Sequence, residues 1–219
     1  MIRAAIFDMD GTLVNSEGCW RIAEREVFGG VGIRITDEMS SITAPLSPRQ
    51  VTEYWYRHQP WPNPCFESIE SAVIQRVAEQ LRSECPALPG AREALEYCAA
   101  RGWRIALASN SPAELCHLVI ERLGVARFFD TVVSVDDVEC GKPDPAIYLL
   151  AARRVGVAPA ECLAFEDSPT GARAALAAGM RVVAIPSAGQ RFVEDEPHLM
   201  LSSLVEFSDH HLEVRKLTT

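Results

Sequence analysis

Short apolar runs alternate with longer amphipathic stretches along most of this chain. The apolar runs occupy positions 4–7, 105–108, 131–135, 162–165 and 182–185. Each run is short, and several are rich in valine and isoleucine, which is typical of strands that are buried on both faces of a parallel sheet.

Helical periodicity fills the gaps between the later runs. The helical stretches are 113–123, 145–155 and 169–178. Each has a proline at or just before its first residue and a glycine directly after its end, which are common signals for helix boundaries. The alternation of strands and helices predicts an α/β fold with a doubly wound, Rossmann-like parallel sheet.

The alternation stops between positions 14 and 86, where the chain is helical and polar and has no convincing buried strand. An insertion of roughly 70 residues is far longer than an ordinary connection. We therefore expect a small helical cap domain, residues 15–85, inserted after the first strand of a core domain formed by residues 1–14 and 86–219. The hinges would lie near 13–17 and 84–90, and the proline-rich segment 59–64 would be a loop between cap helices.

Asp8 and Asp10 come directly after the first apolar run, in the sequence DMDGT. Residues two apart on an extended segment point to the same side, so their carboxylates repel unless one is protonated or a cation lies between them. Mg²⁺ prefers oxygen ligands and accepts one or two carboxylates together with a phosphate. The ordinary alternative is a tight turn, because Asp, Gly and Thr are common turn residues.

Three later motifs place polar or charged residues at or near strand ends, and each has an ordinary explanation when taken alone. Ser109 and Asn110, in LASNSP, suit either a phosphate or the N-cap of a helix. Lys142, in CGKPDP, would neutralise a phosphate and an aspartate, or it would lie exposed in a loop. Glu166 and Asp167 would complete the oxygen shell of a cation, or they would favour the dipole of the helix that follows.

These motifs carry more weight together than alone. In a parallel sheet the carboxyl ends of all strands lie at one edge, so the groups would meet there. A site that combines a cation, carboxylates, a hydroxyl and a lysine is suited to phosphate chemistry.

Charge and cysteine content restrict the partners. The formal net charge of −9 argues against nucleic acid and anionic membranes, although a bound cation would still admit a small anionic substrate. The seven cysteines are scattered without CxxC spacing, which favours a reducing compartment. No apolar run approaches the ~20 residues of a membrane helix, and the N-terminal residues lack a signal-peptide pattern. We therefore expect a cytoplasmic protein.

On these motifs the chain resembles the haloacid dehalogenase (HAD) superfamily, over essentially its whole length. DMDGT resembles the first motif of that family, Ser109 the second, Lys142 the third and EDS (166–168) the fourth, in the family's order. A helical cap just after the first motif resembles the subgroup that contains β-phosphoglucomutase and many small sugar phosphatases. The stretches that extend the likeness to sugar-alcohol phosphatases are AAIFDMDG, WYRHQPW, LPGAREAL and LSSLVEF.

The resemblance implies roles for the acids. Asp8 would be the nucleophile that forms an aspartyl-phosphate, and Asp10 would protonate the leaving alcohol and then activate water. Mg²⁺ would be the cofactor, held by the Asp8 carboxylate, the Asp10 backbone carbonyl and Asp167, with Glu166 in support through water.

The resemblance also implies how phosphate is held. Ser109 and Lys142 would bind the phosphoryl oxygens, and Lys142 would also restrain the nucleophile. Thr12 and Asn110 would assist.

Cap closure would exclude water from the reacting phosphate and place cap side chains over the leaving group. Candidates are Glu17, Trp20, Arg49 and His58, with Trp20 offering an apolar face to the sugar and Arg49 reaching the phosphate. Each has an ordinary alternative: the cap core for Trp20, a helix end for His58 and solvent for Arg49.

We therefore predict a monomeric phosphoric monoester hydrolase that acts on a small phosphorylated sugar or polyol, of the hexitol phosphate or 2-deoxyglucose 6-phosphate type. A phosphosugar mutase and a non-catalytic protein with a relic phosphate pocket are the alternatives. The family's dehalogenases lack an acid at the place of Asp10, and its mutase has a histidine where Trp20 stands, so both residues favour a phosphatase. The complete set of acids argues against a relic.

Overall fold

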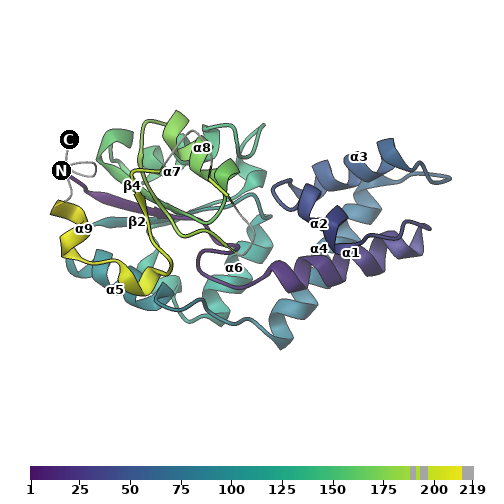
Figure 1. Cartoon of the computed structure of the whole chain (residues 1–219), viewed down its shortest axis with the longest axis horizontal. Coiled ribbons are helices and arrows are strands. Elements are labelled where there is room, and N and C mark those ends of the chain that lie inside the picture. The colour runs from purple at the N-terminus through teal and green to yellow at the C-terminus, as the bar shows by residue number, and fades with distance from the viewer. Residues whose placement is uncertain (188–190, 193–196, 214–219) are drawn as a thin grey trace.

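A six-stranded parallel sheet forms the centre of the core in the computed structural model, which describes residues 1–187, 191–192 and 197–213 (Figure 1). The strands lie in the order β3 (Thr131–Val133), β2 (Arg104–Ala108), β1 (Ala4–Phe7), β4 (Cys162–Glu166), β5 (Arg181–Ala184) and β6 (Leu199–Met200). Every neighbouring pair is parallel. The predicted fold class is confirmed.

The two faces of the sheet are covered by different helices. α5 (Ala91–Ala100) and α6 (Ala113–Arg122) pack on the face to which Phe7 points, whereas α7 (Ala146–Val155) and α8 (Pro169–Ala177) pack on the face of Ile6. Phe7 and Ile6 point to opposite faces because successive strand residues alternate in direction. Helices thus cover both faces of the sheet, which is the doubly wound arrangement. The smaller elements are η1 (Ala126–Phe128), η2 (Val135–Asp137), η3 (Pro159–Glu161), η4 (Leu204–Glu206) and α9 (Asp209–Glu213).

The structure departs from the predicted strands in two places. Of the predicted strand 131–135, only Thr131–Val133 forms a strand. The Ser134 hydroxyl accepts a hydrogen bond from the Asp136 N–H at 3.2 Å, and this bond caps η2, which begins at the next residue. β6 was not predicted, since a two-residue edge strand gives no periodic signal.

The helical insertion after β1 is also confirmed and forms a separate lobe (Figure 1). It consists of α1 (Glu17–Gly30), α2 (Asp37–Thr43), α3 (Pro48–His58) and α4 (Phe66–Ser83). The segment 59–64 connects α3 to α4 as the predicted loop.

Two linkers join the cap to the core, and they hydrogen-bond to each other. The Leu88 N–H donates to the Leu13 carbonyl at 2.9 Å, and the Asn15 N–H donates to the Pro86 carbonyl at 3.0 Å. The exact domain boundaries, between residues 14 and 15 and between residues 85 and 86, stay a prediction. The linkers in which the chain passes from one lobe to the other include these positions.

The sheet order reverses between β1 and β4. The chain runs outward from β1 through β2 to β3 and then returns to the other side of β1 to form β4. Open parallel sheets bind ligands at the carboxyl ends of strands that flank such a reversal. Asp8 directly follows β1, and Glu166 is the last residue of β4.

Two further observations concern the chain as a whole. Across the described ranges, no helix combines the length and apolarity needed to cross a membrane. All seven cysteines are free thiols.

Candidate active site

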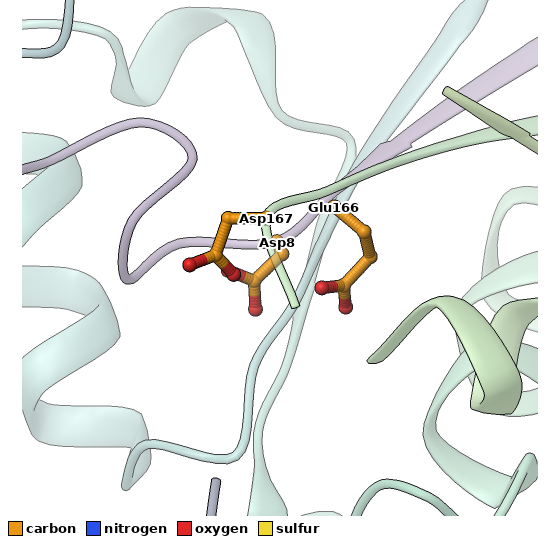
Figure 2. A group of neighbouring side chains, drawn as sticks. All are labelled: Asp8, Glu166 and Asp167. Atoms are coloured by element: carbon orange, nitrogen blue, oxygen red, sulfur yellow. The ribbon is translucent and has the colours of Figure 1, made fainter. Parts of the chain in front are cut away.

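Asp8, Glu166 and Asp167 form a buried cluster of carboxylates at the carboxyl ends of β1 and β4. One oxygen from each lies within 4.8 Å of the others. Figure 2 shows the Asp8 side chain between the other two. Sequence reasoning predicted that these acids, far apart along the chain, would meet, and the structure brings them together.

The electrostatics of this cluster fit a divalent cation. Burial raises the pKa of Asp8 well above its usual range; the Lys142 ammonium opposes this, and the Glu166 and Asp167 carboxylates add to it. Burial and the Glu166 carboxylate raise the pKa of Asp167 to about 7. A cation bound by these carboxylates would offset their mutual repulsion, and Mg²⁺ is suited to such a set of oxygen ligands. The three residues present therefore fit the predicted cofactor.

Lys142 is buried at the centre of the cluster. Its ammonium donates to Asp8 Oδ1 and to Glu166 Oε1, at 2.6 Å each. Burial disfavours the charged lysine, but the two carboxylates outweigh this effect and raise the pKa of Lys142, so the ammonium stays charged.

Asn110 holds the backbone of this lysine rather than standing free to meet a phosphate. Its Oδ1 accepts from the Lys142 N–H at 2.8 Å, and its Nδ2 donates to the Lys142 carbonyl at 3.2 Å. The same amide lies 3.4 Å from the carbonyl of Pro45, a cap residue. Asn110 therefore links the lysine loop to the cap.

Glu166 is fixed by two further donors that sequence reasoning missed. Tyr148 donates its hydroxyl to Glu166 Oε1 at 2.6 Å, and Ser168 donates to Oε2 at 3.2 Å. Any Cβ at Gly171 would lie 1.9 Å from Glu166 Oε1, so this position requires glycine. Tyr148 lies on α7, and its sequence context resembles that of any core tyrosine, whereas Ser168 belongs to the EDS motif.

A second glycine brings Asp167 against the loop after β1. Gly11 has a φ of +80°, and a Cβ there would lie 2.1 Å from Asp167 Oδ2. The glycine of DMDGT is therefore required both for its backbone conformation and for the approach of a carboxylate.

Asp10 has a hydrogen-bond network of its own. Ser111 donates to Asp10 Oδ2 at 2.6 Å, and the Trp20 indole nitrogen donates to Oδ1 at 3.1 Å. Ser16 also donates to Oδ1, and the Ser109 hydroxyl lies 3.5 Å from Oδ2. The Asp10 carboxylate thus does not join the buried cluster, and a ligand role for its backbone carbonyl stays a prediction. Ser16 and Ser111 were missed, although Ser111 follows Ser109 by two residues in LASNSP.

A cavity of about 730 Å³ lies between the core and the cap, above the acid cluster. Its wall includes most of the predicted site residues: Asp8, Asp10, Thr12, Glu17, Trp20, Ser109, Asn110, Lys142 and Asp167. The Thr12 hydroxyl is buried and has no hydrogen-bond partner among the described residues. Glu166 does not line the cavity, but it contacts Lys142, which does.

The structure does not bring the two remaining cap candidates to the cavity. Arg49 binds Glu53 at 3.0 Å and Glu67 at 3.3 Å on the cap surface. His58 Nδ1 lies 2.8 Å from the carbonyl of Tyr54, one turn earlier on α3. Both residues therefore serve the cap itself in this arrangement, because cap residues engage the Arg49 guanidinium and His58 Nδ1.

Comparison with known proteins decides the family. The sequence model of one protein family, the haloacid dehalogenase-like hydrolases, matches residues 2–179, which is most of the chain. The chain belongs to this family. Its enzyme class is that of the HAD-type phosphatases, which hydrolyse phosphoric monoesters.

Two curated relatives and one solved structure illustrate the likeness. Hexitol phosphatase B from Escherichia coli K12 is 37% identical over 213 residues, covering 94% of this chain and 95% of that protein. A phosphorylated carbohydrates phosphatase from Thermotoga maritima is 33% identical, covering 82% of each. A mutant of CbbY from Rhodobacter sphaeroides, in complex with xylulose-1,5-bisphosphate, superposes with a TM-score of 0.87 at 28% identity, over 94% of this chain and 96% of that one.

Proposed function

We propose that this HAD-type phosphatase is Mg²⁺-dependent and hydrolyses a small sugar or sugar-alcohol monophosphate through a phosphoaspartate at Asp8. The observation that carries the proposal is the buried Lys142 ammonium, 2.6 Å from Asp8, in the core wall of a cavity that the cap lines on its other side. A carboxylate is a weak nucleophile, but the covalent step divides a difficult hydrolysis into two easier ones.

In the first step an oxygen of Asp8 forms a bond to phosphorus while the bond from phosphorus to the sugar oxygen breaks. Lys142 fixes the Asp8 side chain and offsets the repulsion between two anions. Thr12 and Ser109, both in the cavity wall, supply hydroxyls to the phosphoryl oxygens. The unpartnered Thr12 hydroxyl supports this role, because a buried hydroxyl without a partner costs free energy.

Asp10 handles the proton. It gives a proton to the leaving sugar oxygen and later takes one from the water that attacks the phosphoaspartate. The donors from Ser111 and Trp20 hold this carboxyl at the junction of core and cap, close to where a leaving group would emerge.

Asp8, Asp167 and Glu166 are the side chains that would hold Mg²⁺, with the Asp10 backbone carbonyl as a further ligand. When bound, the ion supplies positive charge that neutralises the phosphoryl oxygens.

The substrate class rests on relatives and on size. Curated relatives are named for hexitol phosphates and phosphorylated carbohydrates. A cavity of about 730 Å³ falls within the range of roughly 300–1,000 Å³ found for small-molecule sites. A hexitol monophosphate is a molecule of suitable size and polarity.

The test is phosphate release from a panel of hexose and hexitol phosphates, with Mg²⁺ and after treatment with EDTA. We expect release that requires Mg²⁺ and is absent in Asp8→Asn. No release from any ester would contradict the proposal and favour the relic, while conversion between sugar phosphates without release would favour the mutase. Light scattering on the same preparation checks the predicted monomer.

A further inference from the structure

Glu24 is a buried acid that the mechanism above does not use. It lies in the middle of α1 and is 6% exposed. It contributes to the cap side of the cavity wall. No hydrogen bond or ion pair joins its carboxyl to another side chain or backbone group within the described ranges of the chain.

The basic residues nearest to Glu24 along α1 are engaged with other acids. Arg21 lies 3.4 Å from Glu17 and 3.8 Å from Asp37, and Arg25 also binds Asp37. Arg25 is exposed, and Arg21, which also lines the cavity, is paired with Glu17 and Asp37. The carboxyl of Glu24 is therefore left without a cation of its own.

A buried acid without a partner lowers stability. Burial alone raises the pKa of Glu24 to about 7. Removing an acid from water without a compensating hydrogen bond costs free energy, so the carboxyl of Glu24 itself does not stabilise the cap. Such costs are typical of positions that serve ligands rather than the fold.

A second polar group of the cap has the same character. The Ser40 hydroxyl, on α2, is buried without a partner among the described residues, and Ser40 also lines the cavity. Two helices of the cap thus place polar residues without partners in the wall of one cavity, while the phosphate-handling groups line its core side.

We propose that Glu24, together with Ser40, binds hydroxyl groups of the substrate's leaving group and so selects neutral polyhydroxylated monophosphates. A carboxyl accepts hydrogen bonds from vicinal hydroxyls, and the serine adds a donor and an acceptor. A negative charge at this end repels a second phosphate, so bisphosphates are disfavoured. This inference rests on the proposed function and assigns the specificity of the same site.

The test compares substrates with and without hydroxyl groups. The probes are sorbitol 6-phosphate, p-nitrophenyl phosphate and xylulose 1,5-bisphosphate, assayed on the wild-type enzyme and on Glu24→Gln, Glu24→Ala and Ser40→Ala. Glu26→Gln is the matched control, because Glu26 lies on the same helix but is exposed and pairs with Arg76.

We expect Glu24→Ala to lower kcat/KM for sorbitol 6-phosphate by at least about tenfold, mainly through KM, while p-nitrophenyl phosphate changes by no more than about twofold. Glu24→Gln should lose less activity on sorbitol 6-phosphate than Glu24→Ala does. Its activity on xylulose 1,5-bisphosphate, relative to that on sorbitol 6-phosphate, should be higher than in the wild type. Ser40→Ala should show the same pattern as Glu24→Ala, but weaker.

Other results overturn the proposal. Equal losses on sorbitol 6-phosphate and p-nitrophenyl phosphate in Glu24→Gln would show that the residue supports cap structure, and unchanged ratios in all variants would show that it contacts no substrate. If Glu24→Ala does not fold, the isosteric Gln variant and Ser40→Ala decide. Absence of activity in the wild type would instead refute the proposed function, and this proposal would fall with it.

Discussion

The indole N–H of Trp20 donates to the Asp10 carboxylate over 3.1 Å, and this bond connects the first cap helix to the loop after β1. Sequence reasoning assigned Trp20 an apolar face for the sugar. The structure gives its nitrogen a different partner, the expected proton carrier. The position of the cap and the orientation of Asp10 are therefore coupled.

Trp20→Phe tests this coupling, because it keeps an aromatic ring but removes the donor. We expect kcat to fall by about ten- to a hundredfold, since a hydrogen bond to a charged group contributes roughly 1.5–3 kcal/mol. Steady-state kinetics on p-nitrophenyl phosphate measure the effect without a sugar. A change in KM alone, with kcat preserved, would return Trp20 to a purely apolar role.

Asp8→Asn tests the nucleophile. The amide is nearly isosteric but not nucleophilic, so turnover should fall by at least about a thousandfold, as for other residues of a catalytic unit. Circular dichroism should show an unchanged fold, because Lys142 keeps Glu166 as a partner. Substantial activity in purified variant protein would refute the assignment.

Lys142→Met tests the buried charge cluster. Removing the ammonium leaves Asp8 and Glu166 buried without their cation, and breaking a buried pair costs about 3–5 kcal/mol. We expect Tm to fall sharply and to recover in part when Mg²⁺ is added. The gain in Tm with Mg²⁺ should exceed that of the wild type; an equal gain would place the ion elsewhere.

Tyr148→Phe removes the hydroxyl that Glu166 accepts at 2.6 Å. We expect a loss of roughly 1.5–3 kcal/mol in the free energy of unfolding, the usual range for a hydrogen bond to a charged group. The Mg²⁺ concentration for half-maximal activity should rise as well, because Glu166 is less firmly held. Urea denaturation and a Mg²⁺ titration measure the two effects; an unchanged half-maximal concentration would make Tyr148 a residue of the core alone.

Glu24 also predicts a dependence of stability on pH. At low pH the carboxyl is protonated in both folded and unfolded chains, so burial costs little. As pH rises from about 4.5 to about 7, the unfolded chain ionises first and the folded state is progressively destabilised, by on the order of 3 kcal/mol.

The stability of Glu24→Gln relative to the wild type should therefore rise across that window and then level off. Urea denaturation at several pH values measures the difference. Glu26→Gln should show a flat difference in this window, because hydrogen bonding to Arg76 lowers the pKa of Glu26 and confines its own effect to pH below about 4.5. A flat difference for Glu24→Gln would mean that its carboxyl is solvated in the folded protein.

The core of the fold was readable from sequence because its signals are local. Buried parallel strands appear as continuous apolar runs, and the helices between them begin with proline and end with glycine. Asp8, Lys142 and Asp167 were found because each belongs to a motif and because parallel strand ends share one edge.

The missed residues have no such signal. Tyr148 and Glu24 look like ordinary members of amphipathic helices, and only the fold shows that one faces Glu166 and the other the cavity. Arg49 illustrates the reverse: a basic residue of the cap suggested a phosphate contact, but it pairs with Glu53, one turn along the same helix, and with Glu67, which the fold brings near from α4.

The paired linkers between core and cap have a mechanical consequence. Two independent tethers would let the lid twist and slide, but strands cross-linked at Leu13–Leu88 and Asn15–Pro86 behave as one narrow ribbon. We expect this pairing to make the two linkers move together, which restricts the rotations of the cap relative to the core. Substituting proline for Leu88 removes one of the two amide donors that join the linkers, and it should let the cap move more independently while every residue of the catalytic cluster stays the same.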